Sequence, residues 1–148
     1  MYASLDDWIR RQAIPFSVDS PDTFNAALDK VITSFESSVD LLGFGEAFHG
    51  GEDILILRNR LFQRLVETHG FSAIAIEGSS FPRARVVNDY VAGRGPASYE
   101  AVQDTGFGHG FGRLDANRKL VEWMRRYNAD PSHRVELRFY GFDIPTEG

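Results

Sequence analysis

At residues 71–77 the chain reads FSAIAIE, a short apolar run that ends on a carboxylate. This pattern predicts a buried strand that leads directly into Glu77. Two more apolar runs, at residues 39–44 and 135–142, are also predicted to be strands. Helical patterns lie between the runs, and this alternation predicts βαβ units. We therefore expect an α/β fold, with a mostly parallel sheet flanked by helices on both faces.

Five helices are predicted from the spacing of apolar residues and from their end signals. The longest begins with Glu52 and Asp53, whose charges complement the positive end of its dipole, and His69-Gly70 ends it. Its predicted apolar stripe consists of Ile54, Leu57, Leu61 and Leu65. The other helices are expected at residues 4–11, from Pro21 to about residue 35 with Ser20 as the cap, around 86–91 and around 120–127.

The composition bounds the class of protein. A chain of 148 residues predicts one domain over residues 1–148, in which residues 1–38 form a helical N-terminal segment. A net charge of −5 argues against a nucleic-acid partner, and no apolar run approaches the ~20 residues of a membrane span. The N-terminus lacks a signal-peptide core, so a cytoplasmic location is expected. Without cysteine, the chemistry must come from His, Asp, Glu, Ser or Arg.

Acidic residues and a histidine follow the three predicted strands. Glu46 and His49 come after the first strand, Glu77 after the second and Asp143 after the third. The carboxyl ends of parallel strands meet at one edge of a sheet, where α/β proteins bind ligands. Each residue also has a structural alternative, such as a helix cap or a turn. Glu77 is the hardest to explain structurally, because a buried strand seldom ends on an unpaired carboxylate.

His49 has the chemistry of a general base. It lies near the N-terminus of a long helix, whose dipole disfavours the charged imidazolium. A neutral imidazole can take a proton from water, and Glu46 or Glu77 could fix its tautomer. The spacing Glu46-x-x-His49 is also compatible with metal ligands, although it lies in a glycine-rich loop. No Gly-x-Ser-x-Gly elbow is present for a serine nucleophile.

Two other features could belong to the site. His109 lies in the glycine-rich segment 106–112, where Phe107 and Phe111 could form apolar walls or could pack into the core. Arg58 is expected on the polar side of the helix after His49, from which it could reach inward to a carboxylate.

The sequence resembles the erythromycin esterase family. The resemblance rests on six segments in order: GEAFHG at 45–50, LRNRL at 57–61, AIAIE at 73–77, VNDYV at 87–91, LVEWMRRYN at 120–128 and FYGFD at 139–143. It implies hydrolysis of a macrolactone ester, as in resistance to macrolide antibiotics, with no metal and no cofactor. His49 matches the histidine that activates water, Glu46 and Glu77 match the acidic residues beside it, and Arg58 matches a basic position. Phe48 replaces the family's usual Thr and adds an aromatic wall.

Family members are much longer than this chain, so the resemblance implies an incomplete fragment of a larger α/β fold. The predicted catalytic residues are His49, Glu46 and Glu77, and the predicted substrate-binding residues are Arg58, Phe48, His109 and Asp143. The expected partner is a small-molecule ester rather than nucleic acid or a membrane. An unpaired sheet edge would allow a homo-oligomer. Two alternatives stay open: a homologue that only binds a small molecule, and a metal-dependent hydrolase that uses the same residues.

Overall fold

The computed structural model describes residues 4–35, 38–46 and 48–144. The chain divides into two compact units, Met1–Gly43 and Phe44–Gly148. The single domain expected over residues 1–148 stays a prediction. The first unit contains α1 (Leu5–Gln12) and α2 (Pro21–Thr33). Ser20 caps α2 by accepting a hydrogen bond from the Thr23 amide, and Pro21 occupies the first turn, as predicted.

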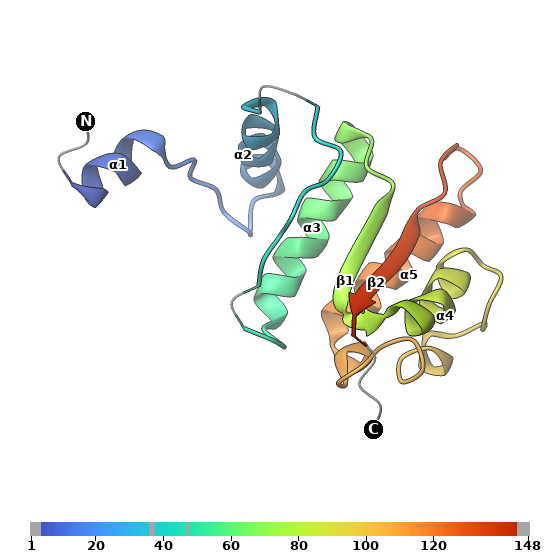
Figure 1. Cartoon of the computed structure of the whole chain (residues 1–148). Helices are drawn as coiled ribbons and strands as arrows, with labels where there is room; N and C mark the ends of the chain where they lie inside the picture. The colour runs from blue at the N-terminus through green and yellow to red at the C-terminus, as the bar shows by residue number, and fades with distance from the viewer. Residues whose placement is uncertain (1–3, 36–37, 47, 145–148) are drawn as a thin grey trace. The chain divides into compact units, whose positions relative to one another are not determined.

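The second unit contains the sheet and most of the helices (Figure 1). Its elements, in chain order, are α3 (Glu52–His69), β1 (Ala73–Ser80), α4 (Phe81–Val91), the short 3-10 helices η1 (Tyr99–Ala101) and η2 (Phe111–Arg113), α5 (Asp115–Ala129) and β2 (Arg138–Asp143). Gly70 ends α3 in the left-handed conformation, with φ of 76°, as the His69-Gly70 signal predicted.

Strands β1 and β2 are parallel, with Ala73 opposite Arg138 and Ile76 opposite Gly141. Helices α4 and α5 lie between them in the chain, so the two strands and their crossover form the predicted α/β arrangement. The strand predicted at residues 39–44 is wrong, because this segment bends at Asp40 and otherwise has no regular secondary structure. Its Leu41 is 90% exposed, and an apolar run without a hydrogen-bonded neighbour forms no sheet.

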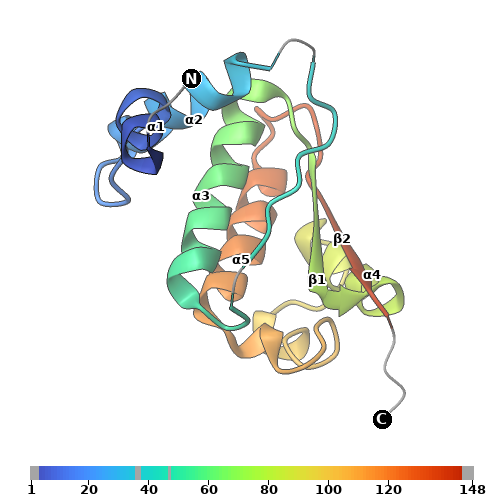
Figure 2. The ribbon, with the colours of Figure 1, turned by 60° about the vertical axis from the view of Figure 1, so that its left-hand side comes forward.

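One face of the sheet contributes to the hydrophobic core. Ile76 and Phe139 pack in a single buried cluster with side chains of all three long helices, and α3 and α5 lie side by side (Figure 2). The expectation of helices on both faces is wrong for the described residues. The other face exposes the alternate side chains, which are Ala73, Ala75, Glu77, Arg138, Tyr140 and Phe142.

The buried stripe of α3 differs from the prediction by one position. It consists of Leu55, Asn59, Phe62 and Val66, with Leu65 beside it. Ile54, Leu57 and Leu61 are only partly buried. This rotation of the helix places Asn59 in the interior and turns the neighbouring Arg58 away from the fully solvated side.

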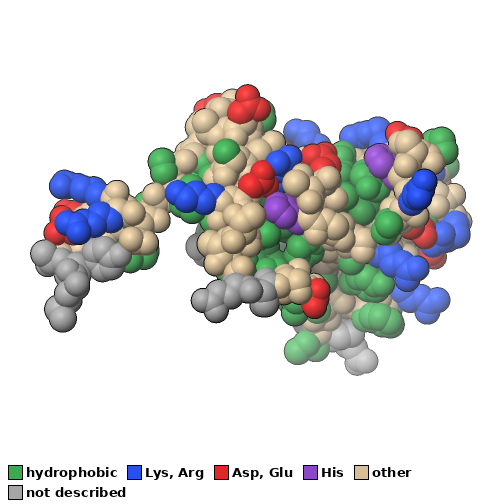
Figure 3. All heavy atoms as spheres, turned by 90° about the horizontal axis from the view of Figure 1, so that it is seen from above, with side chains coloured by type: hydrophobic (Ala, Val, Ile, Leu, Met, Phe, Trp, Pro, Cys, Tyr) green, Lys and Arg blue, Asp and Glu red, His purple; other side chains and the backbone are tan. Residues whose placement is uncertain are grey.

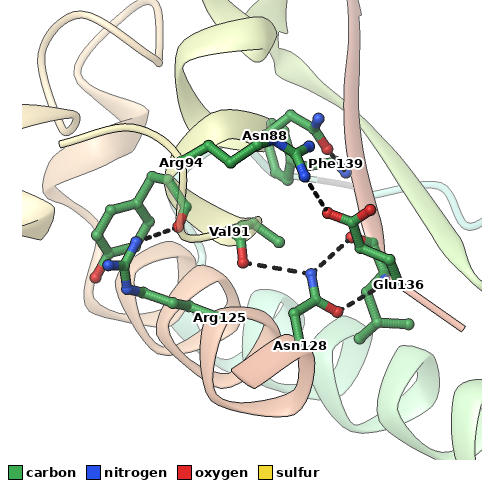
Figure 4. Close-up of polar contacts among 9 residues, drawn as sticks. Asn88, Val91, Arg94, Arg125, Asn128, Glu136 and Phe139 are labelled. Carbon is green, nitrogen blue, oxygen red and sulfur yellow. Dashed lines mark hydrogen bonds and ion pairs between the residues drawn. The ribbon is translucent and has the colours of Figure 1, made fainter. Parts of the chain in front are cut away.

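A set of side-chain to backbone hydrogen bonds joins α4, α5 and β2 (Figure 4). Asn128 donates to the carbonyls of Val91 (3.3 Å) and Leu137 (3.0 Å) and accepts from the Leu137 amide (2.7 Å). The side chain of Asn88 accepts from the Phe139 amide at 3.0 Å. These amides therefore fix the position of β2 against the helices.

Asn128→Ala is expected to lower the free energy of unfolding by about 2–3 kcal/mol, because it leaves partly buried backbone groups of Leu137 and Val91 without partners. Urea unfolding followed by circular dichroism measures this. Arg94→Ala is the matched control: it removes the solvent-exposed ion pair with Glu136, for which about 0–1 kcal/mol is expected. Equal losses in the two variants would contradict the role assigned to Asn128.

None of the helices in the described residues combines the length and the apolarity that a bilayer crossing needs. The molecular face in Figure 3 carries basic and acidic side chains interspersed with apolar ones. The absence of a nucleic-acid partner and self-association through a sheet edge both stay predictions.

Candidate active site

The carboxyl ends of β1 and β2 lie together, with Ser80 opposite Asp143 (Figure 1). β1 continues past Glu77 to Ser80 through an irregularity in the pairing after Ile76. Glu77 is therefore inside the strand and exposed, and the argument from a buried carboxylate is wrong. Ser80 precedes α4 as its N-cap residue, but its side chain makes no capping hydrogen bond.

Glu46 and His49 form a close pair in the loop before α3. The Nδ1 atom of His49 lies 2.5 Å from Oε1 of Glu46. The side chain of His49 is 65% exposed and that of Glu46 is 21% exposed, so the ring is open to water while its partner is held against the protein. Ala47, between them, lies outside the described residues.

The carboxylates around His49 raise the pKa of its imidazole above the ordinary 6.5. The largest cause is the hydrogen bond with Glu46, and the negative charges of Glu46 and Glu77 add to it. Glu77 thus acts on His49 through its charge. The Glu46 carboxylate only accepts hydrogen bonds, so in the neutral ring the proton sits on Nδ1 and the lone pair on Nε2.

Phe111 connects the His49 loop to the sheet. Its ring lies edge-to-face against the His49 ring, with centroids 5.8 Å apart. The same side chain packs directly over Gly78, where an added Cβ would lie 2.6 Å from Cγ of Phe111. Only glycine allows this close approach to β1. Phe111 therefore forms an apolar wall beside His49, whereas Phe107 is buried in the core.

Arg58 is partly buried rather than on the polar side of α3, which corrects the expectation. Its Nη2 donates to Oδ1 of Asn59 at 2.9 Å and to Oδ1 of Asn117 at 2.7 Å. Burial, the largest cause, lowers the pKa of Arg58 to about 10, and attraction to Glu46 and Glu52 opposes this. Arg58 is thus a cation at neutral pH, held by amide oxygens near the acidic side of the site.

A chain of contacts connects Arg58 to His49. Asn117, which accepts from Arg58, donates through Nδ2 to the carbonyl of Phe111 at 2.9 Å. The Phe111 ring in turn contacts the His49 ring.

Glu52 of α3 accepts hydrogen bonds from the amides of Asp115 and Ala116, both at 2.9 Å, and so caps α5. Glu52 itself lies in the first turn of α3, so its hydrogen bonds join the start of α3 to the start of α5.

The sequence argument missed Asn59 and Asn117 as parts of this network. A signal was present, because each stands where the spacing of its helix calls for an apolar residue. Asn59 lies between Leu55 and Phe62 on the buried stripe of α3, and Asn117 precedes Leu120 by one turn. Polar side chains at such positions need hydrogen-bond partners, and here Arg58 supplies one to both.

The other predicted site residues are placed as follows. Nε2 of His109 lies 3.4 Å from Oδ2 of Asp143, the last residue of β2. Phe48 is 71% exposed and packs beside Gly51. Within residues 4–35, 38–46 and 48–144, no three His, Asp or Glu side chains are grouped so that they could hold a metal ion.

These features define an α/β protein with a histidine–carboxylate pair beside the carboxyl edge of a parallel sheet. The chain belongs to the erythromycin esterase family, whose model matches residues 66–148. The match includes Glu77, His109 and Asp143, whereas Glu46, His49 and Arg58 precede it.

Two crystal structures have the same fold. One is of a Bacillus cereus protein, with a TM-score of 0.74 and 25% sequence identity over 90% of this chain and 31% of that one. The other is of a succinoglycan biosynthesis protein, with a TM-score of 0.75 and 26% identity over 90% of this chain and 32% of that one. The chain thus spans about a third of the length of either protein.

Proposed function

We propose that the protein hydrolyses a carboxylic ester, with His49 as the general base that activates water. The observation that carries this proposal is the distance of 2.5 Å between Nδ1 of His49 and Oε1 of Glu46. The rest of the His49 ring is open to solvent. A histidine oriented through one nitrogen by a carboxylate, with its other nitrogen accessible, is the usual arrangement for removing a proton from water.

The proposed reaction starts from the neutral imidazole. Nδ1–H donates to Glu46, and Nε2 accepts a proton as the water oxygen attacks the ester carbonyl. Glu46 and Glu77 then stabilise the imidazolium by the same interactions that raise its pKa. Arg58 provides the positive charge of this region and, through Asn117, supports the wall formed by Phe111.

The proposed substrate is a small-molecule ester, and the family description favours a macrolactone. Arg58, Phe48, His109 and Asp143 are the proposed substrate contacts. Mass spectrometry of a macrolide and of simple alkyl esters after incubation with the protein tests this. A ring-opened macrolide heavier by one water, or the free acid and alcohol released from an alkyl ester, would support hydrolysis. Binding without any hydrolysed product would favour the homologue that only binds, and loss of turnover on chelation, restored by a divalent ion, would favour the metal-dependent alternative.

Glu46→Gln is expected to move the acidic limb of the pH–rate profile to lower pH. Only the neutral imidazole is active, so a raised pKa confines activity to higher pH, and removal of the Glu46 charge lowers that pKa. The plateau rate is expected to fall roughly tenfold, since a weaker base accepts the proton less readily. The measurement is kcat/KM against pH.

Glu77→Gln is the matched control, because Glu77 acts on His49 through charge alone. Its acidic limb is expected to move in the same direction by less. An unchanged limb in Glu46→Gln would show that Glu46 does not tune His49.

A further inference from the structure

A second histidine–carboxylate pair lies at the carboxyl edge of the sheet. His109 contacts Asp143 through Nε2, and the side chain of His109 is 52% exposed while that of Asp143 is 22% exposed. As in the pair of His49 and Glu46, an accessible imidazole is held by a less accessible carboxylate. The mechanism proposed above gives this second pair no role in proton transfer.

The backbone holds His109 in an unfavourable conformation. Its φ is +52°, and among the described residues it is the only one with positive φ that is not glycine. A left-handed conformation is unfavourable for an L-residue, and such residues concentrate at functional sites. The neighbouring Gly110, with φ of +76°, continues the turn.

The loop around His109 is fixed on both sides. The Gly108 amide donates to the carbonyl of Gly78 in β1 at 2.9 Å, and the Phe111 amide donates to the carbonyl of Gly108 at 2.9 Å. Arg83 of α4 donates to the Phe107 carbonyl at 2.8 Å. These bonds hold the left-handed turn in place, so the backbone position of His109 is set by the fold.

The two histidines share one stretch of the sheet edge. Gly78 receives both the Gly108 amide and the Phe111 ring, and that ring contacts His49. In the sequence, His109 thus lies between Gly108, which is bonded to Gly78, and Phe111, which forms the wall beside His49. The Phe111 ring and the Gly108 amide thus connect the His49 loop and the His109 turn to the same residue of β1.

We propose that His109 is the acid that protonates the leaving alcohol, and that Asp143 positions it. This inference rests on the proposed hydrolase function. After His49 has taken a proton from the attacking water, the carbon–oxygen bond to the alcohol breaks, and the departing oxygen takes a proton from Nδ1 of the His109 imidazolium. Nε2 of His109 stays beside the Asp143 carboxylate, whose negative charge favours the imidazolium. Solvent then carries a proton from His49 to His109, so the net reaction consumes one water and yields an acid and an alcohol.

The test compares two esters of one acid with different leaving groups: ethyl butanoate and 4-nitrophenyl butanoate. An alkoxide needs a proton to leave, whereas 4-nitrophenoxide leaves without one. His109→Asn, in which Asn tolerates positive φ, is expected to lower kcat/KM for the ethyl ester by about 100-fold and for the nitrophenyl ester at least tenfold less. Asp143→Asn is expected to show the same selectivity with a smaller loss. The control is His133→Asn. The His133 ring stacks on Tyr127, away from the carboxyl edge of the sheet.

Equal losses for both esters, or no loss for either, would overturn the role of His109, because a structural defect does not distinguish leaving groups. His49→Ala separates this result from a failure of the underlying function, since it should stop turnover of both esters. If the wild-type chain hydrolyses neither ester, or if His49→Ala leaves both rates unchanged, the proposed hydrolase function fails and the inference fails with it.

Discussion

His49→Ala is expected to lower kcat/KM for ester hydrolysis by about 10³–10⁴-fold, with no change in the circular dichroism spectrum. A positioned general base contributes typically 10²–10⁴-fold, and its removal also leaves Glu46 without the group it orients. The fold should persist because the His49 side chain is 65% exposed and its ring contact is with one wall residue, Phe111. Activity and spectrum measured on the same preparation make the comparison.

His133→Ala is the matched histidine control, and its activity should equal that of the wild type. His133 lies in the connection from α5 to β2, where it stacks on Tyr127 with ring centroids 3.6 Å apart. Retained turnover in His49→Ala would remove His49 from the mechanism. A parallel loss of activity and of helical signal would assign the effect to folding instead.

Local signals predicted the parts of the fold that depend on neighbouring residues in the chain. Ser20 and Pro21 start α2, and Gly70 ends α3, where the sequence indicated. Two of the apolar runs predicted as strands form β1 and β2. In the structure each of these strands has the other as its parallel partner. The run at residues 39–44 has similar composition, but composition carries no information about a missing partner strand.

The direction of Arg58 could not be read from the sequence because residues 54–57 are all apolar. Four consecutive apolar residues fit more than one helical face, so the buried stripe is decided by what α3 packs against. The Asn117 amide and the start of α5 approach α3 from 59 and 63 residues further along the chain. Their positions follow from tertiary packing.

The candidate site was predictable as a set of residues but not as two pairs. Glu46 and His49 are three residues apart, so their contact is local. His109 and Asp143 are distant in sequence, and their contact depends on a left-handed turn at a histidine, a conformation that is uncommon for any residue except glycine. Glu77 is exposed because it lies on the open face with Ala73 and Ala75, and the irregular pairing between Ile76 and Ser80 carries β1 beyond its apolar run.

Gly141→Ala is expected to lower the free energy of unfolding by about 3 kcal/mol or more. Gly141 pairs with Ile76 in the centre of the sheet, and a Cβ at this position would overlap with the carbonyl oxygen of Ser79 and lie 2.6 Å from its carbonyl carbon. Those atoms belong to the neighbouring strand, so no side-chain rotation can relieve the overlap. Urea unfolding measures the loss. Gly43→Ala is the control, since an added Cβ there meets nothing within 4 Å, and about 0.5 kcal/mol or less is expected.

The same substitution should also reduce activity beyond what the unfolded fraction explains. Ser79, which must move, donates to the Gly106 carbonyl at 2.6 Å, and the adjacent Gly78 holds both Phe111 and the Gly108 amide. A shift of β1 at Ser79 therefore displaces the wall beside His49 and the turn that carries His109. The test is kcat/KM at a temperature where the variant is fully folded by circular dichroism. Wild-type activity in a folded Gly141→Ala protein would show that the position of this part of β1 does not control the site.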